Sequence, residues 1–308
     1  MKAGIFHVLA GHWAVAAKNC GLEIVWAHEN LKKVSKFFKM NWPDVYFTGN
    51  YDMFERVIEY GKGPYADIIM GSPPCVGIST GNPQASADHA ANQEIIRFAD
   101  TVNRLQPKAF IMEMVSNFKT SKKFKDLYNK YREILKEHYD FISPVLHLHR
   151  YGSPTKRKRV FFIGFHRNYE TTPTTPEAIN TIVTARQIFE GLPNPTEDEA
   201  VAQGWTHKWN PKWKGPYSSL LKDPNFFTLP EDMPGRTFTA VGGVYFRHPD
   251  NHRAITKAEA KRLMGLPDDY KIPAGFSTVI RACAWGVPVM SLNIIIDHVV
   301  KELKSIEV

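Results

Sequence analysis

The chain has 308 residues, of which 43% are hydrophobic, 12% aromatic and 23% charged. This length predicts one large domain or two smaller ones, and the composition excludes collagen-like, coiled-coil and wholly disordered chains. The formal net charge of +8 favours a polyanionic partner, of which nucleic acid is the commonest. The apolar runs at 68–70 and 160–165 are shorter than the ~20 residues that a membrane span needs. Residues 1–12 resemble no cleavable signal, so we expect a soluble, cytoplasmic protein without a membrane partner.

Short apolar runs alternate with helical patterns through the first 165 residues. Each run is bounded by turn formers, which is typical of buried strands in a sheet covered on both faces. The predicted strands are 5–9, 22–26, 45–47, 66–70, 109–112 and 160–164. The predicted helices are 11–19, 32–40, 51–59, 92–105 and 124–137. This alternation predicts an α/β fold with a doubly wound, mostly parallel sheet.

The composition changes after this region. Residues 168–236 are rich in proline and include Trp205, Trp209 and Trp213, which favours a small irregular domain with the tryptophans in its core. Regular patterns return near the end of the chain, in helices predicted at 257–264 and 288–304. We expect a first domain at 1–166, a smaller domain at 167–281 and a segment, 282–308, whose helix returns to the first domain.

Cys75 is the most distinctive of the three cysteines, which have no CxxC spacing and can build neither a disulfide framework nor a four-cysteine zinc site. It follows Pro73 and Pro74, just beyond a predicted strand, where open α/β sheets place their ligands. A lone cysteine is more often a buried structural residue. On this segment alone, the structural and the nucleophilic interpretations are equally favoured.

Two further strands carry charged residues at their ends. Glu113 follows the strand predicted at 109–112. A lone acid at this position is more often a cap or a surface charge. Beside a cysteine, however, it is a candidate proton donor, and burial would raise its pKa. Four consecutive cations, Lys156 to Arg159, precede the strand at 160–164. They form either a solvated loop or a phosphate site. Arg157 and Arg159 are two residues apart, so both can point to the same side and converge on one site.

Taken in this order, the segments around Cys75, at 152–159 and at 256–270 resemble those of the DNA (cytosine-5)-methyltransferase family. The resemblance runs from about residue 5 to residue 300 and implies a Rossmann-like, S-adenosylmethionine-dependent fold. It also implies that the domain at 1–166 carries the chemistry and that the smaller one reads DNA.

The resemblance assigns catalytic roles to four residues. Cys75 is the nucleophile that adds to C6 of cytosine, and Glu113 assists at N3. Arg159 holds the carbonyl oxygen, and Arg157 is its structural neighbour. A base inside a duplex is inaccessible, so the resemblance also implies that the cytosine is flipped out.

On the DNA side, the resemblance implies that residues 76–92 close over the flipped base. Ser79 matches a phosphate-contacting serine, whereas Ala90 stands at the position of an arginine. Thr155 stands where the family has glutamine. The remaining candidates for DNA contact are basic: Lys156, Lys208, Lys212 and Arg236.

The cofactor side departs most from the family pattern. Leu9, Gly11 and His12 lie over the positions of three glycines in the family's first loop. Glu29 matches the acid that binds the ribose hydroxyls, and Asn50 stands near the aspartate that reads adenine. Pro73 and Trp285 are further candidates, although Trp285 replaces an asparagine.

Several interpretations therefore stay open. The enzyme binds S-adenosylmethionine through a rebuilt pocket, or uses a modified donor such as carboxy-S-adenosylmethionine, which His12 and Trp285 motivate. A catalytically silent DNA-binding regulator, or action on RNA or a free nucleotide, are the other hypotheses. We expect a monomer with no metal, acting in restriction, in regulation or for a phage.

Overall fold

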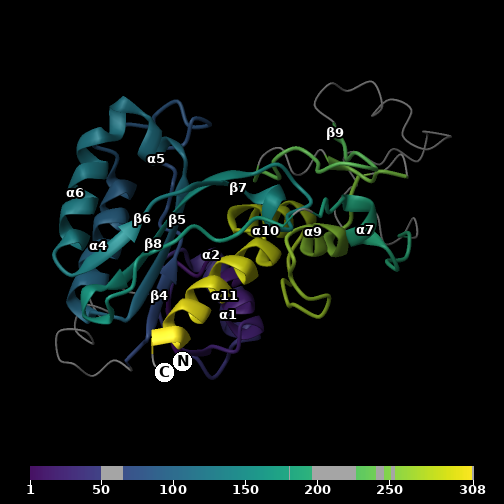
Figure 1. Ribbon diagram of the computed structural model, residues 1–308. Coiled ribbons are helices and arrows are strands. Elements are labelled where there is room, and N and C mark those ends of the chain that lie inside the picture. The colour runs from purple at the N-terminus through teal and green to yellow at the C-terminus, as the bar shows by residue number, and fades with distance from the viewer. Residues whose placement is uncertain (50–64, 180, 196–226, 241–245, 251–253, 307–308) are drawn as a thin grey trace. The chain divides into compact units, whose positions relative to one another are not determined.

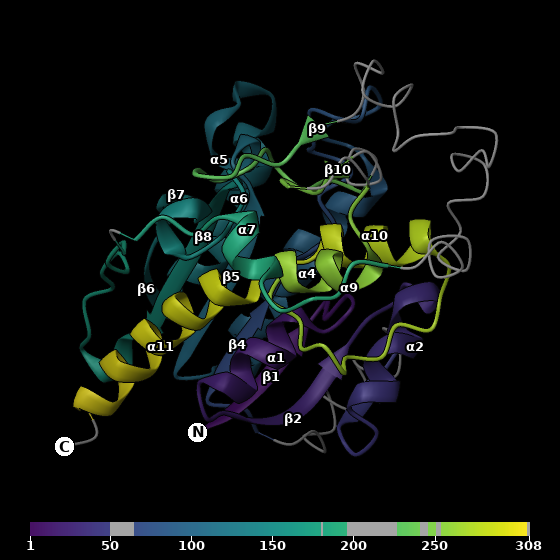
Figure 2. The same ribbon diagram turned by 90° about the vertical axis from the view of Figure 1, so that its right-hand side faces the viewer.

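The alternating strands and helices form an open mixed sheet with helices on both faces (Figures 1 and 2). The computed structural model describes residues 1–49, 65–179, 181–195, 227–240, 246–250 and 254–306. The chain divides into two compact units. Unit 1 comprises Met1–His147, Lys158–Glu177 and Leu292–Val308, and unit 2 comprises Leu148–Arg157 and Ala178–Ser291.

The sheet of unit 1 has the order β3-β2-β1-β4-β5-β8-β6, with β7 paired to β8. The first five strands of this order are parallel, and β8 runs antiparallel to β5, β6 and β7. The strands are β1 (Lys2–Phe6), β2 (Glu23–His28), β3 (Tyr46–Thr48), β4 (Ile68–Gly71), β5 (Ala109–Val115), β6 (Tyr139–Ile142), β7 (Val145–His147) and β8 (Lys158–His166). The predicted α/β class with a mostly parallel sheet is confirmed.

Helices cover both faces of this sheet (Figure 1). In unit 1 they are α1 (His12–Asn19), α2 (Lys32–Asn41), α4 (Gln93–Leu105), α5 (Asn117–Thr120) and α6 (Lys125–Lys136), together with α11 (Val289–Ile306) from Leu292 onward. The core between α4, α6 and the strands is strongly aromatic: Phe98, Tyr131, Phe110 and Phe162 are fully buried within one cluster. Burial of such side chains contributes roughly 1.5–3 kcal/mol each, so this layer fixes the strand ends.

Unit 2 contains shorter elements in its described part. They are η3 (Leu148–Tyr151), α7 (Ala185–Phe189), β9 (Phe227–Thr228), β10 (Phe246–Arg247), α9 (Lys257–Leu263) and α10 (Phe276–Trp285). The capping box expected at the start of α9 is present, because Thr256 Oγ1 accepts from Glu259 N and Thr256 N donates to the Glu259 carboxylate. The expected division at residues 166 and 281 stays a prediction.

Six strands and six helices correspond to the sequence-based expectation, whereas the helix predicted at 51–59 lies outside the described residues. The strands β6 and β7 were not predicted, because four-residue and three-residue runs with polar ends carry too little pattern. The first strand also ends earlier than predicted. It stops at Phe6, since His7 has a positive φ of 56° and leaves the extended conformation.

The region Phe276–Ile306 is long and apolar enough, by length and composition, to cross a membrane. It consists of two helices with a break at Gly286–Pro288, and 72% of its most apolar window is buried inside the protein. In α11 the buried residues Leu292, Ile295 and Ile296 recur at helical spacing. These features are typical of a core helix.

Candidate active site

Cys75 lies beyond the carboxyl end of β4, at the edge of the sheet where β5 also ends. Its carbonyl oxygen accepts hydrogen bonds from Ile78 N at 3.0 Å and Ser79 N at 2.8 Å, so the chain turns tightly directly after the cysteine. The side chain is half-buried against the aromatic core cluster. The segment thus holds Cys75 on a fixed turn and leaves the residue partly exposed.

The segment before Cys75 is also held firmly. Trp13 on α1 is buried, and its indole Nε1 donates to Ser72 Oγ at 2.9 Å. At Gly71, a Cβ would lie 1.9 Å from the carbonyl oxygen of Phe6, so only glycine allows this approach of β4 to β1. Pro73, a predicted cofactor contact, is buried in the same turn. Trp13 was not predicted as a site residue, because an aromatic residue on a helix ordinarily lies in the core.

The other two cysteines are poor candidates for a nucleophile. Burial raises the pKa of Cys20 to about 11 and that of Cys283 to about 12. Cys283 is fully buried, and the Cys20 thiol donates to the carbonyl of Asn293. A thiolate is the reactive form, so both thiols are inert at neutral pH.

Glu113 and Arg159 form a close ion pair, with Arg159 Nε 2.7 Å from Glu113 Oε1. Glu113 lies opposite Phe161, and Val115 lies opposite Arg159, so the two charged residues are diagonal neighbours on one face of β5 and β8. Their side chains are only 7% and 17% exposed, which strengthens the electrostatic contact. The structure therefore brings together two of the residues to which the resemblance assigned catalytic roles.

Arg157 has different partners from Arg159. It is buried in unit 2. Its Nη1 donates to two carbonyl oxygens, that of Ala284 at 3.0 Å and that of Phe238 at 3.5 Å. Ala284 lies at the carboxyl end of α10, where helix carbonyls lack intrahelical partners. Arg157 thus holds the end of the helix that carries Trp285, and these contacts are structural. Trp285 itself is 39% exposed.

Glu29 is held rigidly on the candidate cofactor side. It follows β2, is 2% exposed, and accepts backbone hydrogen bonds from Leu9 N at 2.9 Å and Leu31 N at 2.8 Å. Burial raises the pKa of its carboxyl group, and these two hydrogen bonds oppose that rise. A buried acid just after the second strand of a Rossmann-like sheet suits the hydroxyls of a ribose. The residue type and position therefore fit the nucleoside part of S-adenosylmethionine.

The loop after β1 has left-handed backbone geometry at a residue other than glycine. Leu9 has φ of 53° and Gly11 has φ of 104°. Leucine rarely adopts this conformation, which costs about 1 kcal/mol or more outside glycine. The conformation directs Leu9 N toward Glu29. His12, the third residue over the family's glycines, is fully buried in the first turn of α1.

Histidines and an acid form a buried polar group behind this loop. His7 Nε2 lies 3.2 Å from Glu94, which also pairs with Arg97 at 2.9 Å. The ring of His28 stacks on Phe6. Burial, followed by the charges of His7 and Arg97, lowers the pKa of His28 to about 3, so this ring is neutral at physiological pH. Among the described residues, no three His, Cys, Asp or Glu side chains are placed to hold a metal ion.

The segment 76–92, expected to close over the base, is folded into hydrogen-bonded turns. Ser86 N donates to Gly77 O at 3.1 Å, and the buried Asn92 donates from Nδ2 to the carbonyls of Ser86 and Ala87. Ser79 is half-buried, and its hydroxyl accepts from Gly81 N at 3.3 Å. Asn92 is an organising residue of this segment that the sequence analysis missed.

The DNA-contact candidates of unit 2 differ in accessibility. Lys156 and Arg236 are exposed, and Arg236 lies 3.9 Å above the ring of Phe227. Thr155 is fully buried, with its hydroxyl 3.2 Å from that of Ser153, so in this conformation it presents no group to DNA. Asn50, Lys208 and Lys212 lie outside the described residues.

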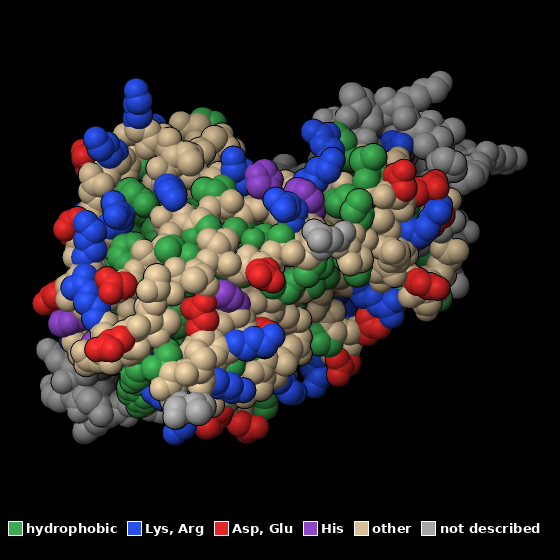
Figure 3. Space-filling model, viewed as in Figure 1, with side chains coloured by type: hydrophobic (Ala, Val, Ile, Leu, Met, Phe, Trp, Pro, Cys, Tyr) green, Lys and Arg blue, Asp and Glu red, His purple; other side chains and the backbone are tan. Residues whose placement is uncertain are grey.

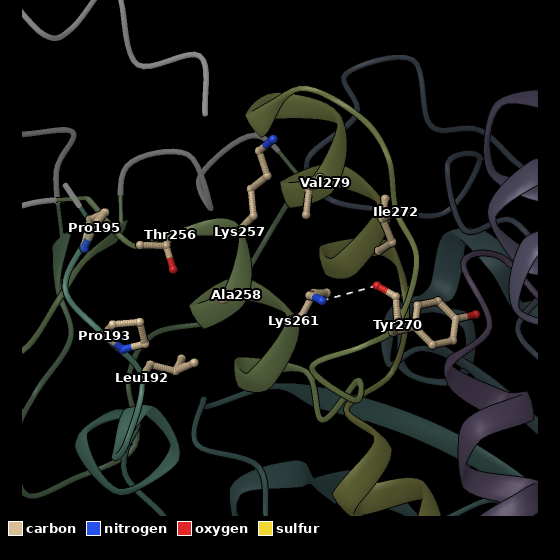
Figure 4. Close-up of a pocket in the computed structure, with 10 residues that line it drawn as sticks. All are labelled: Leu192, Pro193, Pro195, Thr256, Lys257, Ala258, Lys261, Tyr270, Ile272 and Val279. Carbon is tan, nitrogen blue, oxygen red and sulfur yellow. Dashed lines mark hydrogen bonds between the residues drawn. The ribbon is translucent and has the colours of Figure 1, made fainter. Parts of the chain in front are cut away.

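A pocket of about 340 Å³ lies on unit 2 (Figure 4). It is largely apolar and includes two lysines, whose ammonium groups already donate to backbone carbonyls: Lys257 to Ala274 and Lys261 to Tyr270. None of its lining residues is a candidate for chemistry. The pocket therefore gives no support to a second active site.

The sheet order and the helices on its two faces are those of the Rossmann-like fold of S-adenosylmethionine-dependent methyltransferases. The chain belongs to the C-5 cytosine-specific DNA methylase family, which matches residues 9–301. The expected family is thus confirmed, and its members are S-adenosylmethionine-dependent enzymes that act on DNA.

Individual relatives agree with this assignment. A candidate type II methyltransferase of Methanocaldococcus jannaschii is 29% identical over 80% of this chain and 68% of its own length. The type II methyltransferase M.MthTI of Methanothermobacter thermautotrophicus is 24% identical, with 99% of both chains covered. A crystal structure of a candidate DNA modification methyltransferase encoded in an Escherichia coli prophage matches with a TM-score of 0.81 at 20% identity, over 99% of each chain.

Replacing Leu9 by glycine tests the strained loop. Relief of the left-handed strain offsets the lost side chain and the greater freedom of the unfolded chain, so L9G should lie within about 1 kcal/mol of the wild type in unfolding free energy. The neighbouring Val8 is fully buried, and V8G should cost about 3 kcal/mol. Chemical denaturation of both variants measures this. Equal losses in the two variants would show that Leu9 is not strained.

The pKa of His28 predicts a pH dependence of stability. The folded pKa of about 3 lies below the ordinary value of 6.5, so the unfolded chain binds the proton first and stability falls as the pH drops below 6.5. Between pH 6.5 and 5 the wild type should lose about 2 kcal/mol more than H28F, in which phenylalanine keeps the stacking on Phe6. Denaturant unfolding at both pH values measures this difference. Parallel pH curves for the two proteins would contradict it.

Proposed function

We propose that this protein methylates C5 of cytosine in DNA, with Cys75, Glu113 and Arg159 acting on one flipped-out base. The observation that carries the proposal is the buried Glu113–Arg159 pair at the same sheet edge as the half-buried Cys75. The register supports this placement: Gly71, four residues before Cys75, lies opposite Met112, next to Glu113. The reaction needs a nucleophile for C6, a proton donor at N3 and a hydrogen-bond donor to the carbonyl oxygen. A partly exposed cysteine, an acid and a guanidinium at one edge of the sheet match these needs.

Cys75 supplies the nucleophile. Addition of its thiolate to C6 loads electron density onto C5, a carbon that is otherwise too poor a nucleophile. The inert state of Cys20 and Cys283 supports this choice, because only Cys75 combines partial exposure with a position at the strand ends. Loss of the C5 proton and expulsion of the Cys75 sulfur then restore the aromatic ring.

Glu113 and Arg159 take up the charge that the addition creates. Of the nitrogens of Arg159, Nε contacts Glu113 and Nη1 donates to Lys158 O at 2.8 Å. The described residues show no contact for Nη2, which suits the carbonyl oxygen of cytosine. Glu113 must carry a proton when it acts at N3, so we infer that base entry draws Arg159 partly away from the carboxylate. The ion pair thus keeps the carboxylate and the guanidinium side by side at the edge of the sheet.

Glu29, Leu9 and Gly11 would hold S-adenosylmethionine, together with Pro73, all of them in unit 1. Trp285, in unit 2, stays a prediction from the family resemblance. When bound, this cofactor supplies an electrophilic methyl group. The buried Glu29 carboxylate and the left-handed loop support this assignment. A carboxylated donor would need a facing cation, and Arg97 is already paired with Glu94, so no described contact favours that alternative.

We also propose that unit 1 carries the chemistry and unit 2 reads DNA. The exposed Lys156 and Arg236 support contacts from unit 2 to phosphates, and Ser79 would contribute one from unit 1. The same role for Lys208 and Lys212 rests on their charge. Arg157 acts in this scheme as a positioning residue, since it holds the end of α10.

Covalent trapping tests the catalytic proposal. With cofactor, the full chain should form a stable adduct with DNA containing 5-fluorocytosine, because fluorine at C5 blocks the release step. C75A should abolish the adduct, whereas C20A should retain it, since the pKa of Cys20 is raised to about 11. Denaturing gel electrophoresis detects the adduct.

The result also separates the alternatives. A silent DNA-binding protein gives no adduct but shifts DNA equally with and without C75A. An enzyme for RNA or free nucleotides gives an adduct only with those fluorinated substrates. An adduct that survives C75A would sink the assignment of the nucleophile.

The transferred group can be identified directly. Mass spectrometry of DNA from cells expressing the protein should show 5-methylcytosine. A cytosine heavier by a carboxymethyl group would instead establish the modified donor. DNA from cells expressing C75A provides the background in both cases.

A further inference from the structure

Four lysines occur within seven residues of unit 1: Lys119, Lys122, Lys123 and Lys125. We call residues 119–125 the basic segment. All four side chains are exposed, and no acidic residue lies within the segment. Lys and Arg side chains gather over α5 and α6 in Figure 3, where this segment connects the two helices. The segment thus carries a local charge of four within a single turn-and-helix connection.

Two cations in the later part of α6, Arg132 and Lys136, have close partners. Lys136 pairs with Glu133 at 2.9 Å, and Arg132 lies 5.5 Å from the ring centre of Tyr128. By contrast, the salt bridges between described residues include none of the four lysines in the basic segment. Unneutralised positive charge of this density is typical of a surface that meets a polyanion.

The basic segment lies directly beside the turns at 76–92. Lys123 Nζ donates to Ala85 O at 2.5 Å, and Ala85 packs against the aromatic core cluster. The same turns lack a cation at Ala90, where the family resemblance expects an arginine that contacts phosphate. The basic segment therefore provides positive charge next to the position where that contact is missing.

We propose that the basic segment binds backbone phosphates of the DNA duplex and replaces the phosphate contact absent at Ala90. Lys122 and Lys125 make the contacts, because Lys119 and Lys123 already donate to the carbonyls of Ser143 and Ala85. The contacts carry no base information and act on affinity alone. The proposal rests on the proposed action on DNA, but it concerns binding and not the chemistry at Cys75.

The salt dependence of DNA binding tests this surface. Binding of the full chain to a cytosine-containing duplex is measured by fluorescence anisotropy over a series of salt concentrations. Each phosphate contact contributes about 0.9 to the slope of log affinity against log salt, so K122Q/K125Q should reduce its magnitude by about 1.8. The matched control, K130Q/K136Q, removes the same charge from the later part of α6 and should leave the slope unchanged. K122R/K125R should keep the wild-type slope. That result would show that the reduced slope of K122Q/K125Q comes from the lost charge and not from a folding defect.

An unchanged slope in K122Q/K125Q overturns the proposal, and so does an equal reduction in the control. A reduction confined to an RNA duplex of the same sequence overturns the assignment to DNA. The fluorocytosine adduct is recorded separately for the wild type. If no adduct forms but the slope falls as expected, the catalytic proposal fails and the phosphate surface stands.

Discussion

The buried ion pair between Glu113 and Arg159 is the interaction on which the candidate site depends, and it exists because β8 runs against its neighbours. In an entirely parallel sheet, the first residues of one strand lie at the opposite edge of the sheet from the last residues of its neighbour. Reversal of β8 brings its first residues to the carboxyl edge of β5. The one antiparallel neighbour of β5 therefore places a guanidinium beside an acid at the edge where Cys75 also lies.

The opposite side of the site has left-handed backbone geometry at residues other than glycine. Gly11 keeps the freedom that its φ requires, whereas Leu9 holds a similar conformation at an energetic cost. The cost is offset because Leu9 N binds a carboxylate that would otherwise be buried with fewer partners. His7 is the other left-handed residue of this loop and pairs with Glu94. Polar contacts to neighbouring elements thus hold the loop at these two residues.

The fold and the core of the site could be predicted from the sequence because their signals are local. Apolar runs between turn formers marked the long strands, and Cys75, Glu113 and Arg159 stood at strand ends. The contacts of Arg157 could not be predicted in this way. Its spacing from Arg159 indicated a shared direction, but β8 begins only at Lys158, so the strand alternation does not extend to Arg157. Its partners, Phe238 and Ala284, are 81 and 127 residues away in sequence.

Asn92 and Lys123 were missed for a related reason, since both donate to main-chain carbonyls that are not their sequence neighbours: Asn92 to two within its own segment and Lys123 to one 38 residues away. Together they tie the turns at 76–92 by three hydrogen bonds to backbone carbonyls. Each such bond contributes only about 1 kcal/mol net, because water can take its place. Closure over a flipped base would have to carry these bonds along or exchange them for water. Weak, separate hydrogen bonds suit such a movement better than a packed apolar contact would. Each bond can be exchanged for water in turn without exposing the core beneath Ala85.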